Sequence, residues 1–245
     1  MQKSNQIYGI RAIIEAIQAN QPINKVYLQK GAKGDLFKEL EASIRKNKIS
    51  SSYVPVEKLN KLTEHNHQGA IANISSIGFR EFEPLMEEII ESKKNPVFLL
   101  LDQISDVRNF GAIIRTAECC GIDAIIVPKS GSAPLNDDAI KTSAGAAFNI
   151  PISKVDHLKD AIFYLQASSI KLVAATEKTE DSIFDIDFKE SCAIIMGSED
   201  RGINPSILKM VDSKAKLPLL GKIASLNVSV ACGVFLYEMV RQRKA

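Results

Sequence analysis

This chain of 245 residues lacks the features that mark several large classes of protein. No apolar run approaches the roughly 20 residues that a membrane span requires, and the N-terminal MQKSNQIYGI has no apolar core of a signal peptide. No Gly-x-Gly-x-x-Gly follows the first strand predicted for the C-terminal part, which disfavours the usual dinucleotide-binding fold. The apolar fraction of 45% and the charged fraction of 24% are typical of globular proteins. We therefore expect a cytoplasmic protein with no membrane partner.

Cysteine and histidine are sparse and are not spaced as metal ligands. The four cysteines form no Cys-x-x-Cys pair, so we expect reduced, buried thiols and no metal. His65 and His67 would share one face of a strand, but no third Cys or His stands near them, which favours a turn at the surface over a metal site. His157 is typical of a polar surface residue at a helix start. The cysteines are Cys119, Cys120, Cys192 and Cys232.

Charge is nearly balanced overall but is divided unevenly along the chain. The net charge of +2 by itself argues little for a nucleic-acid partner. Residues 1–75 hold 11 basic and 6 acidic side chains, whereas the rest of the chain holds 20 basic and 23 acidic side chains. A basic small domain beside a mildly acidic larger one suits an arm that binds a polyanion while the other part carries the chemistry. A solvated lysine-rich surface explains the same charge equally well.

The first part of the chain alternates between helical and strand patterns. YGIRAIIEAIQAN and DLFKELEASIRKNKI have the periodicity of helices, whereas INKVYLQK and SSYVPV are typical of strands. This alternation predicts a small α/β domain over residues 1–77 that ends in a strand at Gln68–Ile77. A linker over 78–95, which holds a short acidic helix at Pro84–Ser92, then leads to a larger domain over 96–245.

Three polar loops of the larger domain each follow an apolar strand. The first loop follows a buried strand at Val97–Leu101 and ends at Asn109. A helix comes next at Gly111–Cys120 and is closed by Gly121. Asn109 therefore lies near a helix start, where free amides and the helix dipole favour anions. Arg115 lies about two turns into the helix and can reach back toward that end.

The second polar loop lies within CAIIMGSEDRGINPSILKM. It follows a buried strand at Cys192–Met196 and contains Glu199. Gly197 allows the backbone to be approached closely, and Pro205 is suited to the first turn of a helix. A single strand–loop–helix unit of this kind is common in proteins, so it indicates a particular function only in combination with the other two loops.

The third polar loop lies between a predicted strand at Leu217–Leu220, which ends at Gly221, and a long C-terminal helix. Ser225 is a good N-cap for this helix, because its hydroxyl can accept from free amides of the first turn. Asn227 stands two residues further on. The apolar residues of the predicted helix fall close to helical spacing; they are Leu226, Val230, Val234 and Met239.

Together these loops resemble the three motifs of the SpoU family, also called the TrmH family, of RNA ribose 2′-O-methyltransferases. The match holds in order, spacing and flanking strands over residues 96–243. The matching residues are Asn109 with Arg115, then Glu199 in MGSEDRG, then Ser225 and Asn227 in SLNVSVA. Two positions depart from the family pattern, because Val107 stands where Pro is common and Asp200 where Gly is common. These departures concern loop shape rather than the residues expected to carry the chemistry.

The resemblance implies an α/β protein whose C-terminal domain is a trefoil-knotted (SPOUT-type) parallel-sheet domain. It also implies a homodimer in which two knotted chains complete the site. S-adenosylmethionine is the implied cofactor, bound bent in the knot through backbone groups at strand ends. The positions that correspond to this cofactor site are Thr176, Gly197, Leu217, Gly221 and Leu226.

The N-terminal domain is similar to the substrate-binding domain of many SpoU members. The pieces that carry this similarity are YGIRAIIEAI at its start and HQGAIA at its end. Because minimal tRNA-modifying members lack this domain, its presence implies ribosomal RNA as the partner. The implied activity is that of the RlmB-type branch, which methylates a guanosine in 23S rRNA.

The resemblance gives Arg115 the central catalytic role, sometimes that of the general base. A guanidinium does not normally lose a proton, so we favour an Arg115 that clamps a phosphate and stabilises developing oxyanion charge. The role of base stays open. Asn109, Ser225 and Asn227 would orient the substrate and the loops. Glu199 would anchor the site, with an ion pair to Arg115 as one means, although each of these residues also fits a purely structural role.

Two other functions compete with the 23S rRNA methyltransferase. One is a tRNA 2′-O-methyltransferase, against which the basic N-terminal domain argues. The other is a non-catalytic RNA-binding assembly factor on the same fold. The complete set of motif residues argues against that second alternative, and a titration with S-adenosylmethionine would decide it.

Overall fold

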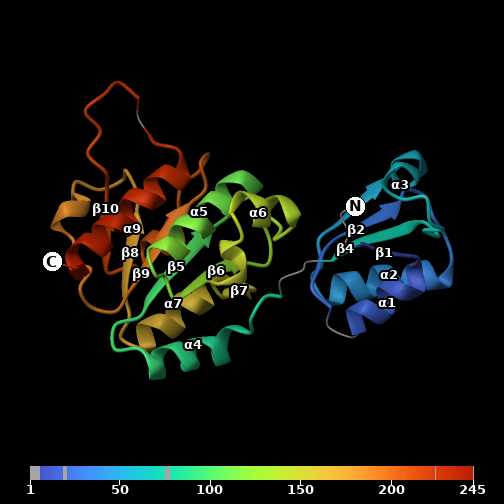
Figure 1. Cartoon of the computed structure of the whole chain (residues 1–245), viewed down its shortest axis with the longest axis horizontal. Coiled ribbons are helices and arrows are strands. Elements are labelled where there is room, and N and C mark those ends of the chain that lie inside the picture. The colour runs from blue at the N-terminus through green and yellow to red at the C-terminus, as the bar shows by residue number, and fades with distance from the viewer. Residues whose placement is uncertain (1–5, 19–20, 75–77, 224, 245) are drawn as a thin grey trace. The chain divides into compact units, whose positions relative to one another are not determined.

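The computed structural model describes residues 6–18, 21–74, 78–223 and 225–244 (Figure 1). The chain divides into two compact units. The N-terminal unit takes in the described residues up to Gly78 and a short segment at Pro134–Asp137, and the C-terminal unit holds the other described residues. No helix in the described part of the chain is long and apolar enough to cross a membrane.

The N-terminal unit contains a four-stranded mixed sheet with the strand order β1-β4-β2-β3. Helices α1 and α2 pack on one face of this sheet, and α3 packs on the other (Figure 1). The alternation of burial along β2 explains this arrangement, because Val26 and Leu28 lie under α1 and α2 while Tyr27 points to the opposite face. The elements are β1 (Gln6–Tyr8), α1 (Ile10–Gln18), β2 (Ile23–Gln29), α2 (Asp35–Lys46), β3 (Ser51–Val54), α3 (Val56–Leu62) and β4 (Ala70–Ile74).

The C-terminal unit is built on a six-stranded sheet in the order β10-β8-β9-β5-β6-β7, in which every neighbouring pair is parallel. Its strands are β5 (Val97–Asp102), β6 (Ala124–Pro128), β7 (Ile152–Val155), β8 (Lys171–Ala175), β9 (Cys192–Gly197) and β10 (Ser213–Ala215). The helices from residue 79 onward are α4 (Phe82–Ser92), which precedes β5, then α5 (Val107–Cys119), α6 (Asp137–Thr142), α7 (Leu158–Ala167), α8 (Pro205–Leu208) and α9 (Val228–Lys244). Two short 3-10 turns are η1 (Ala146–Phe148) and η2 (Ile183–Asp185).

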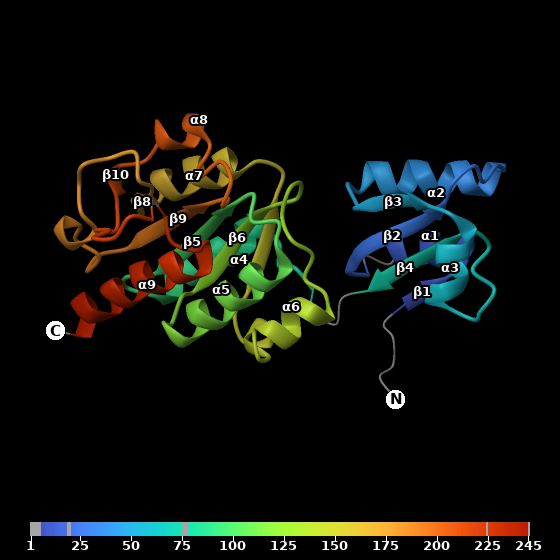
Figure 2. The same cartoon turned by 90° about the horizontal axis from the view of Figure 1, so that it is seen from above.

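Helices cover both faces of this sheet, with α5 and α9 on one face and α4 and α7 on the other (Figure 2). Strands β5 and β9 are buried along their whole length, which explains why both read as continuous apolar runs in the sequence. The predicted α/β organisation, with a small N-terminal domain and a parallel-sheet C-terminal domain, is confirmed. The trefoil knot stays a prediction of the resemblance.

The boundary region differs in detail from the sequence prediction. The last predicted strand of the first domain, Gln68–Ile77, is shorter as β4, and residues 75–77 lie outside the described residues. Most of the segment predicted as a linker over 78–95 forms α4, which begins before Pro84 and packs Leu85 and Met86 into the core of the C-terminal unit. Burial of these side chains makes the segment part of that unit.

Two helix starts also differ from the prediction. Helix α5 begins at Val107 rather than at Gly111, because Asp106 caps it, so Asn109 lies inside the first turn. Helix α9 begins at Val228. Of the four apolar residues at helical spacing, Leu226 lies before the helix start and only Met239 is buried. The buried face of the helix includes Cys232, Phe235 and Leu236 instead.

The predicted strand at Leu217–Leu220 was wrong. Strand β10 lies earlier, at Ser213–Ala215, and Leu220 is fully exposed in the loop that follows. The expectation of four buried cysteines was correct only for Cys192 and Cys232, because Cys119 is exposed and Cys120 half-buried. All four are free thiols, and burial raises the pKa of Cys192 to about 11.

Candidate active site

Three polar side chains from the three loops meet in one hydrogen-bonded cluster. Asn109 donates its amide Nδ2 to Glu199 Oε1 at 2.8 Å. Asn227 donates its own Nδ2 both to Glu199 Oε1, at 2.7 Å, and to Asn109 Oδ1, at 3.0 Å. Residues that are far apart in sequence thus form a closed triangle, which we call the polar cluster. The structure therefore brings together one predicted residue from each motif.

The parallel sheet explains why these loops meet. Strands β5 and β9 are hydrogen-bonded neighbours and pair in register from Val97 with Cys192 to Asp102 with Gly197. Because parallel neighbours end at the same edge of a sheet, the loops that follow them lie side by side. Asn109 follows β5, and Glu199 follows β9.

Asp106 fixes the position of Asn109 on α5. Its carboxylate Oδ1 accepts a hydrogen bond from the backbone N–H of Asn109 at 2.8 Å. This bond is the N-cap of the helix, so a backbone amide of the first turn is satisfied by a negative group. The Asn109 side chain is left to bond Glu199 across to the next loop.

The loop that carries Glu199 folds back sharply on β9. Ser198 and Gly202 exchange two backbone hydrogen bonds, of 3.2 and 2.9 Å. A Cβ atom on Gly197 would lie 2.2 Å from the carbonyl carbon of Gly202, so this close approach requires glycine at position 197. Gly202 itself has φ of 68°, in the left-handed region that also favours glycine.

Asp102 ties this loop to the end of β5. Its buried carboxylate Oδ2 accepts from the backbone N–H of Asn204 at 2.8 Å. Desolvation by burial raises the pKa of Asp102, and the bond from Asn204 opposes that rise. Asp102 is thus a buried acceptor that links β5 to the loop holding Glu199.

Asn227 has two roles, because it also caps α9. Its side-chain Oδ1 accepts from the backbone N–H of Ser229 at 2.9 Å and from the Ser229 hydroxyl at 2.6 Å. The prediction that Ser225 caps this helix was therefore wrong, since α9 begins only at Val228. Ser225 is exposed in the loop before the helix.

Arg115 lies on the exposed side of α5. The ion pair between Arg115 and Glu199 that we considered does not form among the residues that the structure describes, where Glu199 bonds the two asparagines instead. The Arg115 guanidinium is therefore left accessible to a ligand rather than held by the carboxylate. Its reach into the site from α5 remains a prediction.

The residues expected to hold a cofactor follow three adjacent strands. Thr176 follows β8, Gly197 ends β9 and Leu217 follows β10. Thr176 is buried, and its backbone N–H donates to Ala215 O at 2.9 Å, which joins the ends of β8 and β10. In the strand order β10-β8-β9-β5 these ends lie beside the polar cluster.

The other two expected cofactor residues lie in the segment between β10 and α9. Both Gly221 and Leu226 are exposed there. Two residues that the sequence prediction missed, Asp102 and Asp106, support the site from within. The role of Asp106 could have been predicted, because an aspartate just before a helix is a common N-cap. No sequence pattern indicated that Asp102 accepts a hydrogen bond from the loop.

Comparison with known families agrees with this geometry. Residues 96–237 match the family described as SpoU rRNA Methylase. The chain belongs to the SpoU methylase family. Residues 6–78 match a second domain family, described as RNA 2′-O ribose methyltransferase substrate binding. The two matches together cover both units of this SpoU protein.

Curated relatives are similar along the whole chain. A protein of Bacillus subtilis (strain 168), YacO, is named for the TrmH family of tRNA/rRNA methyltransferases; it is 30% identical over 99% of this chain and 97% of its own length. A relative in Staphylococcus aureus (strain MSSA476) with the same family name is 33% identical over 97% of this chain and 96% of its own. This SpoU protein is thus a TrmH-family methyltransferase.

Solved structures share the fold. The SpoU methyltransferase AviRb from Streptomyces viridochromogenes, crystallised with AdoMet, superposes with a TM-score of 0.63 at 22% identity over 98% of this chain and 90% of that chain. A tRNA-modifying TrmH/SpoU enzyme from A. aeolicus superposes with a TM-score of 0.57 at 26% identity, but over only 66% of this chain and 83% of its own.

Proposed function

We propose that this SpoU protein methylates a ribose 2′-hydroxyl in RNA, with S-adenosylmethionine as the methyl donor. The substrate we propose is a guanosine in 23S rRNA, as in the RlmB-type branch. The family matches over both units support an RNA substrate. The A. aeolicus tRNA-modifying enzyme corresponds to only 66% of this chain, which supports ribosomal RNA over tRNA. The free cysteines support a cytoplasmic location.

The observation that carries the proposal is the polar cluster. Asn109, Glu199 and Asn227 come from three separate segments and yet bond one another within 3.0 Å at one edge of the sheet. A cluster of exposed amides and a carboxylate does little for stability, because water competes for each bond. It does fix the three loops around one place where a substrate can bind.

The residues at the strand ends fit an S-adenosylmethionine site. At Gly197 the space for a Cβ is taken by the backbone of Gly202 and Ile203, so the end of β9 presents main-chain groups rather than a side chain to a cofactor. Thr176, Gly197 and Leu217 would hold the cofactor beside the cluster, and Gly221 and Leu226 would close over it. Bound there, the cofactor supplies an electrophilic methyl group on a sulfonium. AviRb and a methyltransferase from Sinorhizobium meliloti have been crystallised with AdoMet, which supports this assignment.

Arg115 is the group that we assign to the reacting ribose. The reaction requires the 2′-hydroxyl to lose a proton, so negative charge develops on its oxygen. A guanidinium stabilises such charge and can clamp the adjacent phosphate through two parallel N–H donors. The exposed position of Arg115, without an ion pair to Glu199, leaves these donors available.

The asparagines and Ser225 would orient the substrate rather than exchange protons. Asn109 and Asn227 are held by Glu199, so their amides keep one arrangement before substrate arrives. Ser225, exposed in the loop before α9 and two positions before Asn227, would contact the ribose. Each of these roles concerns position, and correct orientation of the reacting groups lowers the barrier of a displacement reaction.

The test is to map 2′-O-methyl groups on total RNA from cells with and without this protein. We expect one guanosine in 23S rRNA to lose its methyl group and to regain it when purified protein and S-adenosylmethionine are added. Loss of a methyl group from a tRNA instead would assign the alternative substrate. Failure to bind S-adenosylmethionine in a calorimetric titration would leave a non-catalytic RNA-binding factor as the better description.

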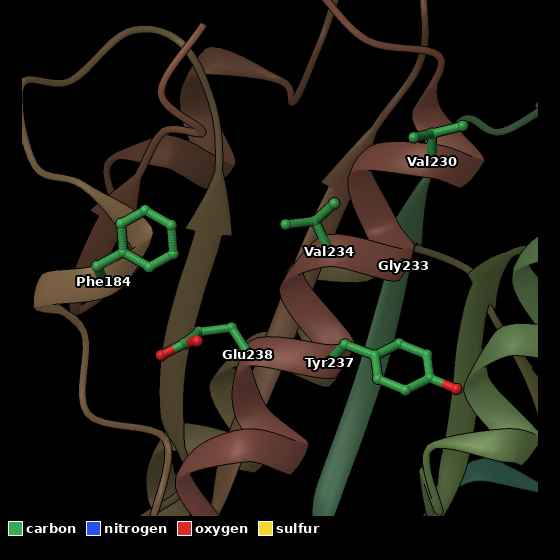
Figure 3. A pocket seen from close by; sticks show the side chains of 6 residues that line it. All are labelled: Phe184, Val230, Gly233, Val234, Tyr237 and Glu238. Atoms are coloured by element: carbon green, nitrogen blue, oxygen red, sulfur yellow. The ribbon is translucent and has the colours of Figure 1, made fainter.

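We also propose that the protein acts as a homodimer through the outer face of α9. Val230, Val234 and Tyr237 lie on successive turns of this helix and are 52%, 39% and 57% exposed (Figure 3). With Phe184 of η2, which is 63% exposed, they line a pocket of about 440 Å³. Apolar side chains gathered on one helix face favour a protein partner. A second copy is the partner that the resemblance implies.

Charge substitution on this face tests the dimer. We expect light scattering to give twice the mass of one chain for the wild type and the mass of a single chain for Val234→Lys with Tyr237→Lys. The matched control is Phe163→Lys, because Phe163 is 62% exposed on α7, which covers the opposite face of the sheet. A monomeric wild type, or a double variant that stays dimeric, would contradict the proposal.

A further inference from the structure

The sheet of the N-terminal unit has one face that is only partly covered. Helices α1 and α2 pack against the other face and form most of the core there. Helix α3 lies on the partly covered face (Figure 1), where its Leu59 packs against Val54 and Ile71. Side chains beside this small cluster remain half-exposed.

Two tyrosines lie on this face, one on each side of Ile71. Tyr8 of β1 and Tyr27 of β2 are both register partners of Ile71 in β4, so all three side chains point the same way. The ring centre of Tyr8 lies 5.0 Å from that of His65, with the two planes tilted by 39°. Both tyrosines are half-exposed, which leaves part of each ring open to a ligand.

Lysines surround the second tyrosine. The ammonium of Lys25 lies 5.4 Å from the centre of the Tyr27 ring, and that of Lys58 lies 5.9 Å away. Both distances are within the range of cation–π attraction, which orders the lysines beside the ring. Lys25 comes from β2 and Lys58 from α3, so two separate elements converge on Tyr27.

A row of polar side chains runs next to the tyrosines. Gln6 and Lys25 are both register partners of Asn73, one on each side of it. Gln6 donates its Nε2 to Asn73 Oδ1 at 3.1 Å. The amides still carry donors and acceptors beyond this bond, and such groups can pair with the edges of bases.

We propose that this face, which we call the tyrosine face (Gln6, Tyr8, Lys25, Tyr27, Lys58 and Asn73), binds unpaired nucleotides of the RNA substrate. One base stacks on the open part of Tyr27, and Lys25 and Lys58 contact the phosphates on either side. Gln6 and Asn73 meet the base edge. The inference rests on the proposed function in taking RNA as the substrate.

The chemistry of the face selects unpaired over paired RNA. Stacking on a side chain requires a base whose own faces are free, which occurs in loops and single strands. The basic character of residues 1–75, with 11 basic against 6 acidic side chains, complements a polyanion. In a duplex the phosphates would be accessible to the two lysines, but no base would be free to stack on Tyr27.

The first experiment removes the charges. Fluorescence anisotropy of the full-length protein would measure affinity for an unstructured RNA of about 12 nucleotides, at several salt concentrations. We expect Lys25→Gln with Lys58→Gln to weaken binding about tenfold or more and to lower the salt slope by about 1.4, as the loss of two phosphate contacts in a single strand predicts. The matched control is Lys38→Gln with Lys46→Gln, which removes two charges from α2, on the covered face. An equal effect of both pairs overturns the proposal.

The second experiment removes the aromatic ring. Tyr27→Phe keeps the ring, whereas Tyr27→Leu keeps apolar packing against Leu59 but loses the stacking surface. We expect the affinity of the leucine variant for the unstructured RNA to fall about tenfold or more, whereas the phenylalanine variant keeps the affinity of the wild type. A blunt RNA duplex is expected to bind the two variants with equal affinity. Equal binding of single strand by the two variants overturns the proposal, provided thermal melts show both to be folded.

Failure of this inference and failure of the proposed function have different signatures. S-adenosylmethionine affinity depends on the C-terminal unit and is expected to be unchanged in every variant of the tyrosine face. If these variants lose RNA binding although no RNA is methylated by the wild type, the inference holds and the proposed reaction fails. If the wild type methylates RNA and the variants bind it normally, the inference fails alone.

Discussion

Asn227 and Asn109 stand 118 positions apart in the sequence, yet the amide Nδ2 of one donates to the Oδ1 of the other at 3.0 Å. The same Nδ2 also donates to Glu199, and the Oδ1 of Asn227 caps α9. One side chain therefore joins two polar loops and starts the last helix. Its donor end and its acceptor end have separate tasks, so they can be tested separately.

Asn227→Asp is expected to abolish most activity and leave the fold nearly unchanged. A carboxylate still accepts from Ser229 and caps the helix, but it cannot donate, and it repels Glu199. Asn227→Ala also loses the cap, so we expect its unfolding free energy to be about 1 kcal/mol lower than that of Asn227→Asp. Methyl transfer assays and urea unfolding measure the two effects. Similar stability for both variants would show that the cap contributes little.

Arg115→Ala is expected to lower the rate of methyl transfer by on the order of 10² to 10³ and to leave S-adenosylmethionine affinity within a few-fold. The reason is that Arg115 stands on α5, whereas the expected cofactor residues follow β8, β9 and β10. Arg115→Lys separates a clamp from a base: a clamp keeps part of the activity, while a base moves the pH–rate profile toward the lower pKa of lysine. Near-normal turnover by the alanine variant would remove Arg115 from the mechanism.

Asp102→Ala is expected to destabilise the loop that holds Glu199. The backbone N–H of Asn204 would lose its acceptor, at a cost of about 1–3 kcal/mol in unfolding free energy. We also expect kcat to be lower in this variant, because Glu199 would no longer be held near the asparagines. Asp102→Asn is the control, since its Oδ1 can still accept and it carries no charge to desolvate. Equal unfolding free energies for the two variants would contradict this role.

Gly197→Ala and Gly221→Ala form a matched pair. A Cβ at Gly197 would meet backbone at 2.2 Å, and backbone cannot rotate away, so we expect a loss of about 1–3 kcal/mol in unfolding free energy. A Cβ at Gly221 meets nothing within 4 Å, so we expect a change within about 0.5 kcal/mol. Denaturant unfolding compares them directly. A neutral Gly197→Ala would mean that the loop after β9 can move aside.

Lys154 gives a pH dependence with a definite sign. Burial, with a smaller effect of Lys129, lowers the pKa of Lys154 to about 8, and its ammonium lies 4.0 Å from the centre of the Phe79 ring. Between that pKa and the ordinary value of 10.5, the unfolded chain binds more protons than the folded one, so stability rises with pH. We expect the stability of the wild type relative to Lys154→Met to increase between about pH 7 and pH 10. A constant difference would show that Lys154 titrates normally.

The sequence was sufficient to predict the α/β organisation and the three loops, because each depends on local pattern. Buried strands such as β5 and β9 are continuous apolar runs, and the polar motifs follow them directly. It was not sufficient to predict which hydrogen bonds close the site. Glu199 had a plausible cationic partner in Arg115, yet it bonds the two asparagines, and that choice depends on distances set by the packed sheet.

The start of α9 was misplaced for a related physical reason. Ser225 and Asn227 are both good N-cap residues, so local preference does not choose between them. Contacts of Asn227 with Asn109 and Glu199 favour the later start. Val230 and Val234 fall at helical spacing and are nevertheless exposed, because apolar spacing alone does not distinguish a core from a surface that binds a partner.

The double role of Asn227 couples the first turn of α9 to the polar cluster, because one side chain bonds to both. Local unfolding of that turn would release the Oδ1 acceptor, and the same movement would take Nδ2 away from Asn109 and Glu199. The backbone amide protons of Ser229 and Val230, both directed at Asn227 Oδ1, therefore report on the state of the site. Their exchange with deuterium would slow when a ligand closes the loops, long before any reaction takes place.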